Sequence, residues 1–190
     1  MMLLRIIYLA FPLILGGILQ SLVLSWNLCA KFAVPLDQGL VLRGKRVFGD
    51  NKTLRGLIVM VLGSMIGMHL QGSLYSVEVF HRLSFFDYSE IDLSWAGAAL
   101  GLGFILGELP NSFVKRQCNV APGGRGTGLF FWFFTVLDQI DSIIGCLVAA
   151  ALTFWVPDRT VVMLTIVLGV LLHMAVNAVF VIMRVKVRVF

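Results

Sequence analysis

The chain has 190 residues, of which 59% are hydrophobic and only 13% are charged. A soluble domain typically carries about 25% charged and about 45–50% apolar residues. The composition therefore excludes a disordered chain and an ordinary water-soluble enzyme, and it predicts a single integral membrane domain over residues 1–190. The net charge is +5, and the three cysteines, Cys29, Cys118 and Cys146, are scattered without the spacing of a disulfide framework or a zinc site.

Four segments have the length and apolarity that a membrane-crossing helix needs, which is about 20 residues. They are residues 3–26, 54–74, 93–109 and 160–183. The first resembles the apolar core of a signal peptide, but it is too long and lacks a small-residue cleavage site, so we interpret it as a span. The third is short, and its glycines at 97 and 101, and at 103 and 107, favour close helix approach.

A further apolar run, residues 129–156, is too long for one untilted span, and Asp138 and Asp141 interrupt it. We expect its helix to start near Asp138 and to end before Pro157, because burying two aspartates at the bilayer centre would cost several kcal/mol each. The aromatic residues 130–134 would then lie among the lipid headgroups. The sequence thus predicts an all-α membrane bundle of about five transmembrane helices.

The basic residues fix the expected orientation of a five-span bundle. Twelve of the fifteen Lys and Arg fall on one side, which should face the cytosol. They are Lys31, Arg43, Lys45, Arg46, Lys52, Arg55, Lys115, Arg116, Arg125, Arg184, Lys186 and Arg188. We therefore expect a multi-pass protein of the cell membrane with its N-terminus outside, its C-terminus in the cytosol and catalytic cytosolic loops. Residues 75–93 would form a solvated outer connector rather than an interfacial helix.

The first cytosolic loop mixes basic residues with Gly, Asp, Asn and Thr over residues 44–56. Glycines let the backbone approach a bulky anion, and Lys and Arg donate charge-assisted hydrogen bonds to phosphate. Thr53 is placed to cap the following helix. The loop therefore predicts phosphate binding; the alternative is a loop that serves topology alone. The candidate substrate-binding residues are Lys45, Arg46, Gly49, Asp50, Asn51, Lys52, Thr53 and Arg55.

A second polar cluster follows the third span and continues into the fourth. Asp138 and Asp141 are three residues apart, so both carboxylates lie on one face of a helix. Such a pair beside phosphate oxygens suits Mg²⁺; the alternative is a pair neutralised by Lys or Arg. Upstream of it lie a third carboxylate, two basic residues, a hydroxyl and a glycine loop: Glu108, Lys115, Arg116, Ser112 and Gly123.

These motifs together resemble the CDP-archaeol synthase family, a relative of the CDP-diacylglycerol synthases. The segment GKRVFGDNKTLRG at residues 44–56 is similar to that family's first-loop signature. Ser112-x-x-Lys115-Arg116, Pro122-Gly123 and Asp138-x-x-Asp141 resemble the core of the wider cytidylyltransferase signature. The Lys-Asp pair and the His-Gly-Gly motif of the diacylglycerol branch are absent, which favours the archaeol branch.

The resemblance implies transfer of CMP from CTP to a membrane lipid phosphate, with release of pyrophosphate and a requirement for Mg²⁺. Asp138 and Asp141 would be metal ligands, with Glu108 as a third. Lys115 and Arg116 would act with them in catalysis, while Ser112, Gly123 and the first loop would bind substrate. The expected partners are CTP, a lipid phosphate and the bilayer, and no nucleic acid.

Two other functions remain as alternatives. A CDP-alcohol phosphotransferase would also use aspartates and a metal, but its Asp-Gly-x-x-Ala-Arg framework is missing, since Gln139 follows Asp138. A transporter or assembly subunit would carry polar residues through its spans, whereas here they gather on one face. For the lipid chains the sequence leaves two alternatives, ether-linked isoprenoids and ester-linked fatty acids.

Overall fold

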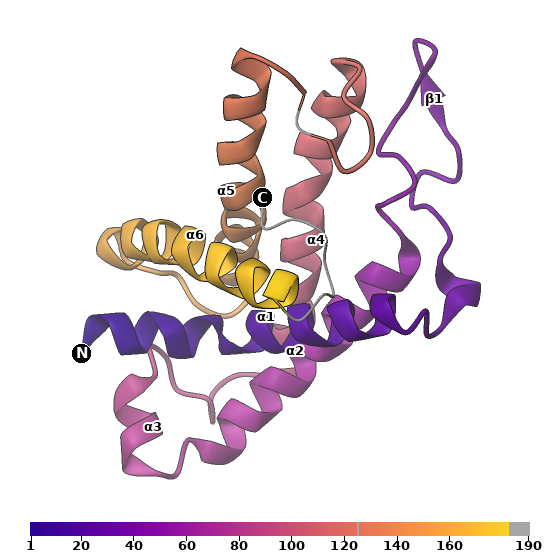
Figure 1. The fold of residues 1–190 in the computed structure, drawn as a ribbon. Helices are drawn as coiled ribbons and strands as arrows, with labels where there is room; N and C mark the ends of the chain where they lie inside the picture. Colours follow the sequence, from indigo (N-terminus) through magenta and orange to yellow (C-terminus); the bar gives the residue numbers. More distant parts are fainter. Residues whose placement is uncertain (125, 183–190) are drawn as a thin grey trace.

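The computed structural model describes the backbone of residues 1–124 and 126–182, and side chains through residue 175 except that of His173. Four of the twelve basic residues used to predict the orientation lie outside the described residues. They are Arg125, Arg184, Lys186 and Arg188. Within the described residues the regular secondary structure is helical apart from one small hairpin, in agreement with the predicted all-α class (Figure 1). Its elements are α1 (Met2–Ser25), η1 (Ala30–Phe32), β1 (Val41–Leu42), β2 (Lys45–Arg46), α2 (Leu54–Leu74), α3 (Glu78–Leu83), α4 (Leu93–Gln117), α5 (Leu129–Thr153) and α6 (Arg159–Ile182).

Four helices within the described residues, α1, α2, α4 and α5, are long and apolar enough to cross a membrane. The fifth long helix, α6, has 24 residues, and Arg159–Leu172 is its described apolar part. The predicted membrane bundle is therefore confirmed, with four clear spans and α6 as the fifth candidate. The predicted end of that fifth span, Met183, lies outside the described residues.

Glycines hold α4 tightly between α2 and α5. A methyl group built on Gly97 would lie 2.5 Å from the Cα atom of Met65 in α2, and one on Gly101 would lie 2.6 Å from the Cα atom of Val61. On the α5 side, a methyl group on Gly103 would lie 2.6 Å from the carbonyl oxygen of Gly145. The predicted close approach is thus confirmed, because each pair of glycines meets a different neighbour.

The connecting segments gather at two ends of the bundle. Loop 1, which we define as residues 26–53, meets the C-terminal turn of α4, where the Lys45 ammonium donates to the backbone oxygen of Gln117. We call this the loop end. At the other end, the α3 end, Arg5 of α1 donates to the backbone oxygen of Ser84 at 2.6 Å, and the ring of Phe86 packs edge-on against Phe154. In Figure 1, α4 and α5 stand side by side, and α1 and α6 run across them.

Two predicted helix boundaries and the prediction of a helix-free outer connector were wrong. The third span does not end near residue 109: α4 continues through Pro110 to Gln117, because residues beyond the proline are buried against α5 and loop 1. The fourth helix starts at Leu129 rather than near Asp138, since Phe134 is fully buried and packs beneath the Lys115 ammonium, 5.5 Å from its ring centre. The outer connector contains a short helix, α3.

Candidate functional site

Two carboxylates of α5 converge on a single side-chain amide of α4. The Nδ2 atom of Asn111 donates to Asp138 at 2.6 Å and to Asp141 at 2.7 Å. Asp141 also accepts the backbone N–H of Ser142 at 2.7 Å. Asn111 and Asp141 are buried, with 5% and 8% of their surface exposed. The structure therefore brings the predicted aspartate pair together on the face of α5 that packs against α4, with Asp141 buried and Asp138 partly exposed.

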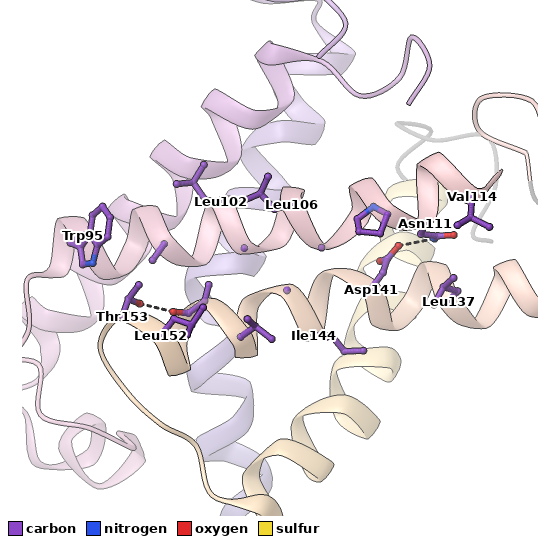
Figure 2. A pocket seen from close by; sticks show the side chains of 17 residues that line it. Trp95, Leu102, Leu106, Asn111, Val114, Leu137, Asp141, Ile144, Leu152 and Thr153 are labelled. Carbon is purple, nitrogen blue, oxygen red and sulfur yellow. Dashed lines mark hydrogen bonds between the residues drawn. The ribbon is translucent and has the colours of Figure 1, made fainter. Parts of the chain in front are cut away.

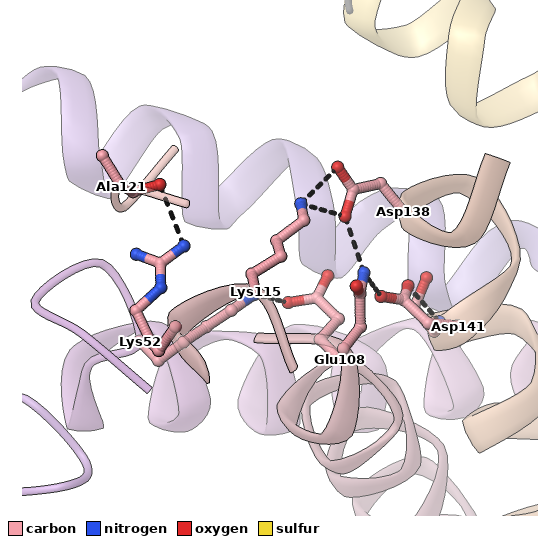
Figure 3. A network of polar contacts seen from close by, with 9 residues as sticks. Lys52, Glu108, Lys115, Ala121, Asp138 and Asp141 are labelled. Carbon is pink, nitrogen blue, oxygen red and sulfur yellow. Dashed lines mark hydrogen bonds and ion pairs between the residues drawn. The ribbon is translucent and has the colours of Figure 1, made fainter. Parts of the chain in front are cut away.

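Lysines from two different elements surround these carboxylates (Figure 3). The Lys115 ammonium donates to both oxygens of Asp138, at 2.5 and 2.6 Å. The Lys52 ammonium of loop 1 pairs with Glu108 of α4. Within the described residues Asp141 forms no ion pair. The network thus contains three carboxylates, of Glu108, Asp138 and Asp141, and two ammonium groups.

Loop 1 is organised by the buried carboxylate of Asp37, whose side chain has no exposed surface. One oxygen accepts the backbone N–H groups of Phe48 at 2.9 Å and Gly49 at 3.0 Å. The other accepts the N–H of Gly39 at 3.2 Å and the guanidinium of Arg46 at 2.6 Å. Burial alone would raise the pKa of Asp37, but the hydrogen bonds from Arg46, Gly49, Phe48 and Gly39 outweigh burial and hold that pKa well below its usual range. The carboxylate therefore stays charged.

Arg116 lies where loop 1 meets the end of α4. Its guanidinium donates to the backbone oxygen of Ala121 at 2.9 Å, yet its Nε and Nη1 atoms are buried and have no partner among the described residues. Gly49, with a φ of +91°, passes so closely that a methyl group there would lie 3.3 Å from Nη1 of Arg116 and 3.2 Å from Pro122. A buried cation with two unused donors beside a glycine backbone is suited to an anion such as phosphate.

The other predicted loop residues divide by their contacts. Thr53 caps α2 as predicted, accepting the N–H of Gly56 at 3.2 Å. Arg46 is shared between Asp37 and the exposed Asp50, and the buried Arg55 donates to Asn27 at 2.9 Å and to the backbone oxygen of Leu28 at 3.1 Å. These contacts hold the loop itself, and those of Arg55 reach its first residues, Asn27 and Leu28. Among the remaining candidates, Ser112 is buried, whereas Asn51 and Gly123 are exposed.

Asn111 and Asp37 are site residues that the sequence argument missed. A signal for Asn111 exists: Glu108, Asn111 and Lys115 are three and four residues apart, so they share one face of a helix if the helix continues past Pro110. Placing a helix end at residue 109 hid that pattern. For Asp37 no such signal exists, because most of its donors are backbone N–H groups whose positions depend on the fold of the loop.

The aspartate pair is chemically suited to Mg²⁺. Within the described residues no three His, Cys, Asp or Glu side chains are grouped closely enough to hold a metal by themselves. Mg²⁺, however, commonly takes one or two protein carboxylates and completes its shell with phosphate oxygens and water. The oxygens of Asp138 and Asp141 converge on one atom, and the buried Oδ1 of Asn111 beside them lacks a partner among the described residues. Asp138 is also held by Lys115 and Glu108 by Lys52, whereas Asp141 has no ion-pair partner among the described residues.

An apolar groove leads from this cluster along the contact between α4 and α5 (Figure 2). It has a volume of about 670 Å³, with Asn111 and Asp141 lining one end and Trp95 and Thr153 the other. Between them the walls are apolar side chains and the backbone of glycines. The remaining lining residues are Ala99, Leu102, Gly103, Leu106, Gly107, Pro110, Val114, Leu137, Ile144, Gly145, Val148, Ala149 and Leu152.

Fold and site together define a class: a helical membrane protein with a partly buried cluster of carboxylates and lysines at one end of an apolar groove. Comparison with known proteins gives the family. A family model described as CarS-like, CDP-archaeol synthase, matches residues 2–189. The chain belongs to this family, which confirms the resemblance seen in the sequence motifs.

Individual relatives agree with the family model. The chain is 30% identical over 173 residues to a CDP-archaeol synthase of Pyrococcus furiosus, covering 87% of this chain and 80% of that protein. It is 30% identical over 154 residues to one from Methanococcoides burtonii, covering 76% of this chain and 83% of that protein. A solved structure of an intramembrane enzyme for archaeal membrane lipid biosynthesis superimposes with a TM-score of 0.57 at 27% identity, covering 89% of this chain and 92% of the other.

Proposed function

We propose that this chain transfers CMP from CTP to a phosphorylated diether lipid of the archaeol type, giving a CDP-lipid and pyrophosphate. The observation that carries the proposal is the position of the Asp138–Asp141 pair beside a basic loop, with Asp141 lining one end of an apolar groove. A lipid phosphate needs such a place, because its chains belong in an apolar groove and its headgroup next to cations. Membership of the CDP-archaeol synthase family supports both the nucleotide and the lipid class.

In the proposed reaction, an oxygen of the lipid phosphate attacks the α-phosphorus of CTP. A new P–O bond forms, the bond from the α-phosphorus to the oxygen bridging the β-phosphorus breaks, and pyrophosphate leaves with the electron pair. A phosphate monoester is already ionised near neutral pH, because its second pKa is about 6, so no base is required to activate it. The protein must instead bring two anions together and offset the charge that builds on the leaving group.

Lys115, Arg116 and Lys52 would supply that positive charge. Lys115 and Lys52 each hold a carboxylate in this structure and can exchange it for a phosphate oxygen, while Arg116 already has two unused donors. Ser112 and the exposed backbone at Asn51 and Gly123 would add neutral contacts to CTP. The other candidate residues of this region would act mainly by holding the conformation of loop 1 through the contacts described above. They are Lys45, Arg46, Thr53 and Arg55.

Asp138 and Asp141 would hold Mg²⁺, with Glu108 as a third carboxylate in the same network. Bound Mg²⁺ supplies positive charge at phosphate oxygens and thereby favours departure of pyrophosphate. The excess of three carboxylates over two ammonium groups in the described network supports a cation at this place.

The groove between α4 and α5 would hold a lipid chain. From Asn111 back to Trp95 is sixteen residues of helix, or about 24 Å at 1.5 Å per residue, which is longer than one leaflet and comparable with most of the roughly 30 Å hydrocarbon core. We further propose that the loop end faces the cytosol, with the N-terminus outside and the C-terminus inside. Loop 1 and the end of α4, which carry most of the described basic residues, lie at that end.

The test is pyrophosphate release from CTP with a phosphorylated diether lipid, using detergent-purified protein. Asp138→Asn and Asp141→Asn keep the side-chain size but remove charge, so activity should fall by several orders of magnitude, since each 1.36 kcal/mol is about tenfold in rate. Asp87→Asn, the same change at an exposed carboxylate at the α3 end, should leave the rate unchanged. Near-normal rates in both α5 variants would overturn the proposed site, and use of a CDP-alcohol in place of CTP would favour a CDP-alcohol phosphotransferase.

A further inference from the structure

We infer that Asp37 is a positioning residue that holds the Gly49–Lys52 segment of loop 1 in the conformation that receives the triphosphate of CTP. This inference rests on the proposed function for the identity of the nucleotide. The geometry on which it stands is a carboxylate with no exposed surface, surrounded by donors from three parts of the same loop. The donors are the backbone N–H groups of Gly39, Phe48 and Gly49 and the guanidinium of Arg46.

The segment that Asp37 fixes is the part of loop 1 that reaches the site. Gly49, held through its own N–H, lies against Arg116 and Pro122, and three residues later Lys52 pairs with Glu108. The backbone N–H of Lys52 also donates to the oxygen of Gly49 at 3.4 Å, which makes the segment a tight turn. Movement of Gly49 would therefore displace both Lys52 and the backbone facing the free nitrogens of Arg116.

A carboxylate is required at this position, and an amide of the same size does not replace it. Both oxygens of Asp37 accept two or more hydrogen bonds. In the Asp37→Asn variant one of the two acceptors would become an N–H₂ donor facing donors, leaving buried backbone N–H groups unpaired. The lost negative charge would also leave Arg46 without its buried partner, in a loop that is already basic. The Asp37→Asn change should thus release the turn without touching Arg116 or the aspartate pair.

The experiment compares the kinetics of wild type with those of Asp37→Asn. A positioning role predicts that KM for CTP rises about tenfold or more while kcat stays within about threefold, because binding is weakened but the reacting groups remain. Asp158→Asn is the matched control. Asp158 accepts the backbone N–H of Val161 at 2.9 Å, and Asn serves that role equally well, so its kinetics should not change. An unchanged KM, or a fall in kcat with KM unchanged, would overturn the inference.

Hydrogen–deuterium exchange gives a second measurement that does not depend on CTP turnover. In wild type, the amides of Phe48 and Gly49 should exchange slowly for loop residues, and in Asp37→Asn a peptide spanning residues 45–53 should exchange faster while α2 stays unchanged. Fast exchange of these two amides in wild type would overturn the inference even if the variant does not fold. If wild type fails to transfer CMP while the exchange pattern holds, the proposed function fails and the ordering of the loop by Asp37 stands.

Discussion

Asn111 is a neutral side chain placed between two carboxylates that repel each other. Its Nδ2 atom donates to both, so it draws Asp138 and Asp141 toward one point without neutralising either. Lysine at the same place would pair with them and compete with a metal ion. In the proposed metal site, the amide would orient the two carboxylate ligands without adding charge, and such orienting groups commonly govern metal affinity.

Replacing Asn111 with Ala should separate the binding of Mg²⁺ from the chemistry. We expect the Mg²⁺ concentration for half-maximal activity to rise by about 10–100-fold, since losing a hydrogen bond to a ligating carboxylate typically costs that much in metal affinity or activity. At saturating Mg²⁺ most of the wild-type rate should return. The measurement is a Mg²⁺ titration of CMP transfer. An equal loss of rate at every Mg²⁺ concentration would show that Asn111 does not act through the metal.

The packing of α4 against α5 decides whether these residues meet at all. Gly107 faces the backbone oxygen of Asp141, and Gly145 faces that of Gly103, so the two helices touch through their backbones one to two turns from the site. Any side chain there must push α5 outward and carry the aspartates away from Asn111 and Lys115. The glycines of α4 thus contribute to the geometry of the site as well as to stability.

Gly107→Ala should accordingly reduce both stability and activity. Overpacking of a close contact typically costs about 1–3 kcal/mol, and the displaced Asp141 should lower the rate further than a stability loss alone explains. Gly17→Ala in α1 is the matched control, because a methyl group there meets no atom within 4 Å and alanine favours a helix over glycine by up to about 1 kcal/mol. Thermal unfolding and CMP transfer in detergent measure the two effects. A fully active Gly107→Ala protein would contradict this packing argument.

The bounds of a helix were predictable from the sequence where the apolar run and the capping residue mark the same position. The second span was predicted at residues 54–74 and α2 occupies Leu54–Leu74, because an apolar run begins directly after the capping Thr53. The end of α4 and the start of α5 were not. α4 continues beyond its apolar run because Pro110 is tolerated inside it, and α5 begins before Asp138 because that carboxylate is satisfied by Lys115 and Asn111. Tertiary contacts that a single sequence does not show decide both boundaries.

At the scale of the whole molecule, the proposed site residues gather at one end. Loop 1, the last turns of α4 and the early turns of α5 meet there, whereas α3, the start of α1 and the end of α5 meet at the other end. The sequence predicted this division from alternating spans and charge counts. The contacts confirm which segments lie together; the side of the membrane that each end faces follows from the charge argument alone.

Two native cysteines make that orientation testable. Cys29 in loop 1 and Cys118 after α4 are exposed at the loop end, and Cys146 is buried in α5. With the loop end in the cytosol, a membrane-impermeant maleimide added to right-side-out vesicles should leave Cys29 and Cys118 unmodified until the membrane is permeabilised. Glu90→Cys adds an exposed thiol at the α3 end, near the buried Tyr88, and it should react at once. Peptide mass spectrometry identifies the modified residues, with Cys146 as the unreactive reference. Immediate reaction of Cys29 or Cys118, or protection of the thiol introduced by Glu90→Cys, would reverse the proposed orientation.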